Sequence, residues 1–268
     1  MTKIKERFWI WGHEAGSHDN RWGLGGPSKI TPAEGAAYLD MSNIIMVRSK
    51  GKPAPPFEQY PSVLGSLKQV VWSIVSPGGK IESGELDAVL DLARRAPNMC
   101  GVIMDDFFKA KPDEKGNIAA YTLEELKAIK KRLVLDGRKL ELWVTFYTAN
   151  LDLPDVGKHL KPCDVMTYWT WYSKDLNDLE QNFERLEKLV PSKRKLLGCY
   201  MWDYGDKKPL SIPLMEHQCN LGLKWLREGR IEGMIFLASC ICDMGLEAVE
   251  FTRKWIQEVD EKSLCKHH

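Results

Sequence analysis

The sequence has no apolar run long enough to cross a bilayer and no excess of either charge. Its 38 Lys and Arg residues balance 37 Asp and Glu residues, which gives a formal net charge of +1. Because no stretch is strongly basic, we expect no nucleic-acid partner, and the lack of a long apolar run predicts no membrane-embedded part. The first residues, MTKIKERFWIWG, lack a signal-peptide hydrophobic region. This leaves a cytoplasmic location open and, where a leader has been removed, a periplasmic or secreted one.

Several common site patterns are also missing. The seven cysteines are odd in number and stand mostly in apolar segments, so we expect reduced core residues and no disulfide framework. Cys240-Ile-Cys242 has neither zinc-ribbon nor thioredoxin spacing. The segment WGHEAGSHD, after the first apolar run, is not the GxGxxG turn of a dinucleotide-binding fold. His13 alone among the histidines follows a predicted strand, so we expect no metal and no cofactor.

What the sequence does have is eight short apolar runs in 268 residues that are 44% hydrophobic. Most are continuously apolar, as expected of parallel strands that are buried on both faces. The runs are RFWIWG (7–12), NIIMVRS (43–49), QVVWSIVS (69–76), CGVIMDD (100–106), LELWVTFY (140–147), DVMTYWTW (164–171), KLLGCYMW (195–202) and GMIFLASC (233–240).

Amphipathic segments with helix-start signals separate these runs. Thr31–Glu34 and Thr122–Glu125 are capping boxes, and Ser173 is expected to cap a helix. The apolar stripe of that helix is Leu176, Leu179, Phe183 and Leu186, and the last helix carries Leu246, Val249, Trp255, Ile256 and Val259. No linker interrupts the alternation. The sequence therefore predicts one (β/α)8 barrel domain over residues 1–268, with an open doubly wound sheet as the alternative.

In a (β/α)8 barrel the active site lies at the carboxyl ends of the strands. Aromatic side chains, carboxylates and amides follow the predicted strands there. Rings of Trp and Tyr stack on the C–H faces of sugars, while carboxylates and amides bind hydroxyl groups, so the pattern predicts a carbohydrate substrate. The expected substrate-binding residues are His13, Glu14, Tyr147, Asn150, Trp169, Trp171, Trp202 and Asp203.

Simpler structural roles compete with these assignments. Trp9, Trp11, Trp72 and Trp143 are expected mainly to pack the core, whereas Trp169, Trp171 and Trp202 stand at strand ends, where pocket and core are equally expected. His13 also fits a strand cap. Glu14 also fits an ion pair with Arg21 or Lys29, and Asp243 fits a loop or a cap of the last helix.

The segment GVIMDDFF at 101–108 carries the strongest signal. Two adjacent carboxylates repel each other and are costly to bury, yet Asp105 and Asp106 end an apolar strand. Consecutive strand residues point to opposite faces, so both can serve one pocket only if the strand breaks or twists there. The competing interpretation has one Asp capping the next helix and the other paired with Lys109 or Lys111. Since a cap needs only one carboxylate, we favour a site.

GVIMDDFF resembles the strand-four signature of O-GlcNAcase-type hexosaminidases, and DVMTYW resembles the VMTYD segment of chitinase-like barrels. Both families are (β/α)8 retaining glycosidases in which the 2-acetamido group of the substrate takes part in catalysis. The sequence departs from chitinases in two respects: it lacks DxxDxDxE, and Trp169 replaces the aspartate of VMTYD.

The resemblance implies three catalytic residues. Asp106 would be the general acid and then the base. Asp105 would accept a hydrogen bond from the acetamido N–H and stabilise the oxazolinium, and Tyr168 would donate to the acetamido oxygen.

Two alternatives stay open: a glycosidase with the strand-four and strand-seven carboxylates Asp106 and Asp203, and a lectin-like barrel that binds carbohydrate without cleaving it. The sequence identifies neither the sugar nor any partner protein.

Overall fold

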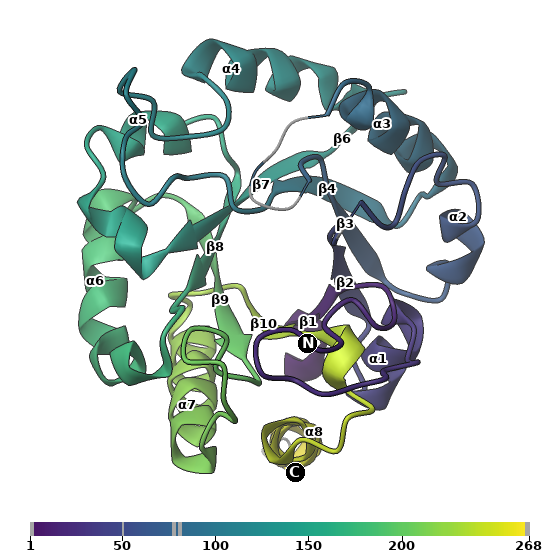
Figure 1. The fold of residues 1–268 in the computed structure, drawn as a ribbon, viewed down its shortest axis with the longest axis vertical. Helices are drawn as coiled ribbons and strands as arrows, with labels where there is room; N and C mark the ends of the chain where they lie inside the picture. Colours follow the sequence, from purple (N-terminus) through teal and green to yellow (C-terminus); the bar gives the residue numbers. More distant parts are fainter. Residues whose placement is uncertain (1–2, 50, 77–78, 80–81, 266–268) are drawn as a thin grey trace.

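The computed structural model describes residues 3–49, 51–76, 79 and 82–265, with side chains as far as Val259. Eight parallel strands close into a barrel in the order β1-β10-β9-β8-β7-β4-β3-β2, surrounded by helices (Figure 1). The pairing of Phe8 with Met234 brings the first and last strands together and closes the ring. The predicted (β/α)8 barrel is confirmed, and the open sheet is excluded.

The barrel strands coincide with the eight apolar runs of the sequence. Some end sooner than their runs, because the chain there turns into the loops of the barrel mouth. Their bounds are β1 (Phe8–Gly12), β2 (Asn43–Met46), β3 (Gln69–Ser73), β4 (Met99–Met104), β7 (Glu141–Tyr147), β8 (Val165–Trp169), β9 (Arg194–Tyr200) and β10 (Gly233–Leu237). A separate antiparallel hairpin consists of β5 (Val134–Leu135) and β6 (Arg138–Lys139).

The helices cover the outside of the barrel (Figure 1). The α-helices are α1 (Pro32–Tyr38), α2 (Tyr60–Val63), α3 (Glu85–Arg95), α4 (Leu123–Arg132), α5 (Val156–Leu160), α6 (Leu179–Leu189), α7 (Ile212–Glu228) and α8 (Glu247–Cys265). Short 3-10 segments are η1 (Ile4–Arg7), η2 (Thr148–Asp152), η3 (Ser173–Asp178) and η4 (Ser239–Ile241). None of the described helices is long and apolar enough to span a membrane.

Two of the three predicted helix starts are confirmed. Thr31 and Thr122 each form a reciprocal capping box, with Glu34 and Glu125 respectively. The predicted cap at Ser173 is wrong, because a 3-10 turn precedes α6 and the Ser173 hydroxyl donates to Asp203 instead. The apolar stripe predicted for this segment is nevertheless buried against the barrel.

The core assignment holds for Trp9, Trp72 and Trp143, whereas Trp11 is buried but lines the cavity at the carboxyl ends of the strands. Trp9, Trp11, Trp72 and Trp143 are all buried. Trp9 and Trp143 pack inside the barrel, 5.0 Å apart between ring centroids, while Trp72 faces outward onto Tyr60 of α2. Six cysteines are free, and the side chain of Cys265 lies outside the described residues.

Candidate active site

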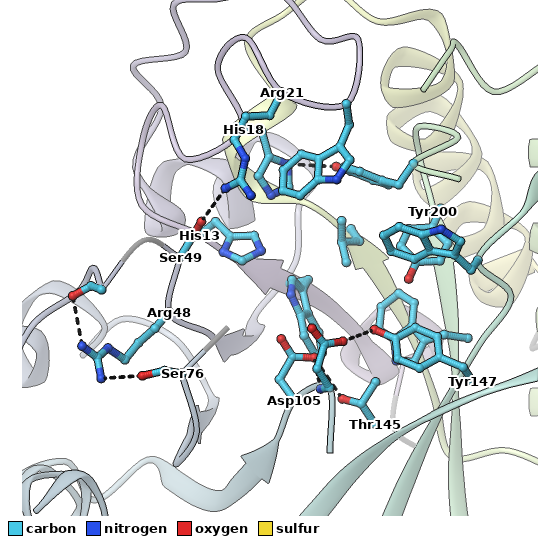
Figure 2. A pocket seen from close by; sticks show the side chains of 18 of the residues that line it. His13, His18, Arg21, Arg48, Ser49, Ser76, Asp105, Thr145, Tyr147 and Tyr200 are labelled. Carbon is cyan, nitrogen blue, oxygen red and sulfur yellow. Dashed lines mark hydrogen bonds between the residues drawn. The ribbon is translucent and has the colours of Figure 1, made fainter. Parts of the chain in front are cut away.

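A cavity of about 520 Å³ opens at the carboxyl ends of the barrel strands (Figure 2). Carboxylates, rings and cationic side chains line it together. The lining residues are Trp11, His13, His18, Arg21, Trp22, Arg48, Ser49, Gly51, Ser76, Glu82, Asp105, Asp106, Thr145, Tyr147, Trp169, Trp171, Tyr200, Tyr204 and Leu237.

Asp105 reaches this cavity because of the alternation along β4. A Cβ on Gly101 would face Trp143 inside the barrel, 3.0 Å from its Nε1, so the residues at 103 and 105 also face inward. Asp105 then lies beside the neighbouring strand, where Thr145 Oγ1 donates to its Oδ1 over 3.3 Å.

Asp106 turns into the same cavity because the strand has ended. Its φ of +47° is in the left-handed region, which Asp adopts more readily than most residues. This conformation breaks the alternation, so its Oδ1 accepts a hydrogen bond from the Tyr147 hydroxyl over 2.8 Å. Its backbone N–H donates to Asp105 Oδ1 over 2.9 Å. Neither aspartate has the Lys109 or Lys111 partner of the competing interpretation, since Lys109 pairs with Asp113.

The two carboxyl groups differ in depth. Thr145 and Tyr147 are both inward-facing positions of β7, and two residues of a strand span about 6.6 Å. Asp105 contacts Thr145, whereas Asp106 contacts Tyr147 at the end of the strand. Asp105 therefore lies deeper in the barrel, and Asp106 lies nearer the mouth.

Burial and the neighbouring charge of Asp106 raise the pKa of Asp105 well above its usual range. A raised pKa keeps a proton on the pair at a pH where an exposed aspartate has lost it. Burial, together with the charges of Asp106 and Asp105, also raises the pKa of Tyr200. Burial, together with Tyr200 and the charges of Asp106 and Asp105, likewise raises the pKa of Tyr147. Both phenols therefore keep their protons and remain hydrogen-bond donors.

Aromatic rings form a continuous wall beside the carboxyl pair. Trp169 contacts both Trp11 and Tyr200, at 5.1 Å between centroids in each case. Tyr200 in turn contacts Trp171 at 5.8 Å and Tyr204 at 5.4 Å. Rings next to carboxyl groups offer a sugar an apolar face and hydrogen-bonding groups in one cavity.

The wall depends on a glycine at 198 in β9. A Cβ there would lie 2.1 Å from Cδ2 of Trp169, so the indole lies directly over the backbone. We expect Gly198→Ala to lower the free energy of unfolding by about 1–3 kcal/mol, as overpacking does in other cores. Urea denaturation would measure the change. In the matched control Gly157→Ala, within α5, the new methyl meets its first neighbour at 3.8 Å, so no loss is expected; an equal loss in both variants would contradict the packing argument.

Six of the predicted site residues line the cavity: Asp105, Asp106, His13, Tyr147, Trp169 and Trp171. Five do not: Glu14, Asn150, Tyr168, Trp202 and Asp203. Glu14 accepts a hydrogen bond from the Tyr60 hydroxyl. Asn150 is buried, and its side chain accepts from the Tyr147 backbone N–H over 2.8 Å. Both therefore support the loops around the mouth rather than the cavity itself.

The placement predicted for Tyr168 is wrong. Trp169 faces into the barrel, so the preceding residue points out to the helices. Tyr168 is fully buried there, against Phe183 of α6 at 5.9 Å between centroids, and its hydroxyl lies 2.9 Å from Thr148 Oγ1. It cannot donate to a ligand in the cavity from this position.

We therefore expect Tyr168→Phe to leave catalytic rates nearly unchanged. Removal of the buried hydroxyl should lower the free energy of unfolding by about 1 kcal/mol, the usual net value of one hydrogen bond. Thermal or urea denaturation beside a steady-state assay would check both parts. A large fall in kcat with unchanged stability would show that Tyr168 has a catalytic role and would contradict this placement.

Asp203 and Trp202 organise a loop instead of lining the cavity. The Asp203 side chain is fully buried; its oxygens accept hydrogen bonds from the Ser173 hydroxyl and, over 3.0 Å, from the Asp206 backbone N–H. Trp202 Nε1 donates to the Trp22 backbone oxygen over 2.8 Å. The pairing of Asp106 with Asp203 as two catalytic carboxylates therefore has no support in this geometry.

Several lining residues escaped prediction from the sequence. Tyr200 lies two residues after Gly198 in β9 and therefore faces the barrel interior as well. This two-residue period could have identified Tyr200 from the sequence. His18, Arg21 and Trp22 belong to the loop after β1, and Tyr204 to the loop after β9. Loop residues carry no such periodicity, so their approach to the cavity was not visible. Within the described parts of the chain, no group of three or more His, Cys, Asp or Glu side chains is placed to hold a metal ion.

Neither a protein-family model nor a curated protein matches the sequence. Solved structures do match the fold. The Bacillus megaterium QM B1551 spore cortex-lytic enzyme SleL is 15% identical, with 97% of this chain and 74% of that chain covered and a TM-score of 0.59. Active domain 2 of a thermostable chitinase from Pyrococcus furiosus is 10% identical, over 97% and 96% of the two chains, with a TM-score of 0.57.

A third match is a xylanase-α-amylase inhibitor protein, XAIP-I, in complex with trehalose. It is 11% identical over 93% of this chain and 97% of that chain, with a TM-score of 0.60. At such low identity these matches show the (β/α)8 barrel fold alone, which a cortex-lytic enzyme, a chitinase and an inhibitor protein share.

Proposed function

We propose that the protein is a glycoside hydrolase that cleaves an N-acetylhexosaminide with help from the substrate's own acetamido group. One observation carries the proposal: two adjacent carboxyl groups at different depths share a cavity with a wall of aromatic rings. Two of the matched structures are a cortex-lytic enzyme and a chitinase, which agrees with this class of reaction.

The depth of each carboxyl group supports its role. A sugar stacked on the rings would direct its 2-acetamido group down the barrel towards Asp105, and its leaving group towards the mouth, near Asp106. The acetamido N–H needs an acceptor, so Asp105 acts as an anion in the complex. In the proposed mechanism Asp106 then carries the proton for the leaving group. The phenol of Tyr200, which stays protonated, replaces Tyr168 as the donor to the acetamido oxygen, because the Tyr147 hydroxyl already donates to Asp106.

The reaction proceeds in two steps. The acetamido oxygen attacks the anomeric carbon while Asp106 gives its proton to the leaving oxygen, so the glycosidic bond breaks and an oxazolinium forms. Asp105 stabilises the positive charge through the ring N–H. Asp106, now a carboxylate, removes a proton from water as the water attacks the same carbon, which reopens the ring and restores the acid.

The non-catalytic alternative keeps one observation in its favour, since a matched barrel is named as an inhibitor protein. Turnover separates the two. A panel of aryl glycosides should include pairs that differ only in a 2-acetamido or a 2-hydroxyl group. We expect hydrolysis of 2-acetamido members alone. Binding without turnover would favour the lectin-like alternative, and equal turnover of both members of a pair would exclude acetamido participation.

A further inference from the structure

Arg21 is a cation at the edge of the cavity. Within the described part of the chain its guanidinium contacts Ser49 Oγ at 3.4 Å and the Trp22 ring at 4.0 Å from the centroid, and it forms no ion pair with an Asp or Glu. The second arginine that lines the cavity, Arg48, differs in this respect, because it pairs with Glu82 and Glu85, each at 2.9 Å. One positive charge at the mouth therefore remains uncompensated.

The loop that carries Arg21 is held in place from two sides. The Trp22 backbone oxygen accepts the hydrogen bond from Trp202, and His18 Nδ1 lies 3.0 Å from the Tyr204 hydroxyl. Both contacts join the loop after β1 to the loop after β9. The guanidinium is thus positioned before any ligand arrives, which lowers the entropic cost of binding through it.

His13 supplies a second, independent feature beside Arg21. It is only 8% exposed, it lines the cavity, and its buried Nδ1 has no hydrogen-bond partner among the residues that the structure describes. Burial and the charge of Arg21 lower the pKa of His13 to about 3, so the ring is neutral and donates through one nitrogen. An unpaired buried polar atom is costly unless a ligand satisfies it. Figure 2 shows His13, Arg21 and Ser49 gathered on the side of the cavity away from Tyr147 and Tyr200.

We propose that Arg21, His13 and Ser49 form a subsite for an oxyanion carried by the substrate, a carboxylate or a sulfate ester on the sugar. This inference rests on the proposed function and narrows it to acidic N-acetylhexosaminides. A guanidinium, an imidazole N–H and a hydroxyl are donors that match the oxygens of such a group. The carboxyl pair on the neighbouring wall retains a proton, so an anion at Arg21 meets only one negative charge across the cavity.

Binding of matched sugars by the native protein tests the subsite. Calorimetric titration would compare N-acetylglucosamine with its 3-O-lactyl ether, which adds a carboxylate, and with its 6-sulfate. Charge-assisted hydrogen bonds predict at least one acidic sugar bound about ten- to a hundredfold more tightly than the neutral one. The acidic sugar that binds more tightly shows whether the subsite prefers a carboxylate or a sulfate. Equal binding of all three sugars would remove the subsite and leave the proposed function intact, whereas no binding of any would overturn both.

Substitutions test whether Arg21 causes the preference for acidic over neutral sugars. Arg21→Gln should bring the ratio of acidic to neutral affinity close to one, and Arg21→Lys, which keeps the charge but loses the forked donors, should retain part of it. Arg253→Gln is the matched control, because Arg253 also lies over a ring, that of Tyr38 at 4.6 Å, but outside the cavity. That control should keep the native ratio. A preference that survives in Arg21→Gln would place the anion elsewhere and overturn the proposal.

Discussion

Asp106→Asn is expected to lower hydrolysis of unactivated N-acetylhexosaminides by on the order of 10²–10⁴, the usual contribution of general acid–base catalysis. Asp106 is the carboxyl group nearer the mouth, held by Tyr147, and no other described acid contacts that hydroxyl. The amide keeps the size of the side chain but has no proton to give to the leaving oxygen. Steady-state kcat/KM on a disaccharide would measure the loss.

The leaving group distinguishes an acid from a merely structural residue. A substrate with an activated aryl leaving group barely needs protonation, so its cleavage should suffer much less in Asp106→Asn. The control is Asp91→Asn, whose exposed carboxylate pairs with Arg94 on α3, away from the cavity. It should behave as native on both substrates. Full activity of Asp106→Asn on unactivated glycosides would show that Asp106 is not the acid.

Asp105→Asn should lower the rate on activated and unactivated substrates alike, by roughly 10²–10³, as loss of one transition-state-stabilising group does elsewhere. Asp105 lies beneath Asp106, beside Thr145, where the acetamido group would sit. It acts on the nucleophile and not on the leaving group, so activation of the leaving group cannot compensate. Steady-state rates on aryl N-acetylhexosaminides would measure this.

A thiazoline mimic of the oxazolinium adds an equilibrium readout. Catalytic sites bind transition-state-like ligands more tightly than substrates, so the native protein should prefer the thiazoline to the substrate. Asp105→Asn should weaken that binding, since the ring nitrogen loses its anionic partner. If the thiazoline does not bind while Asp203→Asn abolishes turnover and Asp105→Asn spares it, the acetamido mechanism is wrong and the buried Asp203 would have to be reconsidered.

The strands and the carboxyl pair could be predicted because local pattern determines them. Buried parallel strands need continuous apolar runs, and a doubled aspartate at a strand end has few structural uses. The position of Tyr168 could also have been derived, since period two places it opposite to Trp169. The resemblance of VMTYW to a chitinase segment led to the wrong face because the function was carried over without that alternation.

Apart from His13, the other side of the cavity could not be predicted. Arg21 reaches the mouth through a loop whose position depends on a hydrogen bond between Trp22 and Trp202, 180 residues apart in the chain. Asp203 looked available at a strand end, but its buried side chain is occupied by hydrogen bonds from Ser173 and Asp206. Such contacts follow from tertiary packing of irregular loops, for which the sequence carries no periodic signal.

The nucleophile itself can be tested through the electron demand of the acyl group. Aryl glucosaminides with 2-acetamido, fluoroacetamido, difluoroacetamido and trifluoroacetamido groups share one leaving group and differ in the basicity of the carbonyl oxygen. If that oxygen attacks the anomeric carbon, each added fluorine withdraws electrons from the nucleophile, and kcat/KM should fall steadily along the series. A rate that does not change with fluorine content would contradict acetamido participation above the Asp105–Asp106 pair.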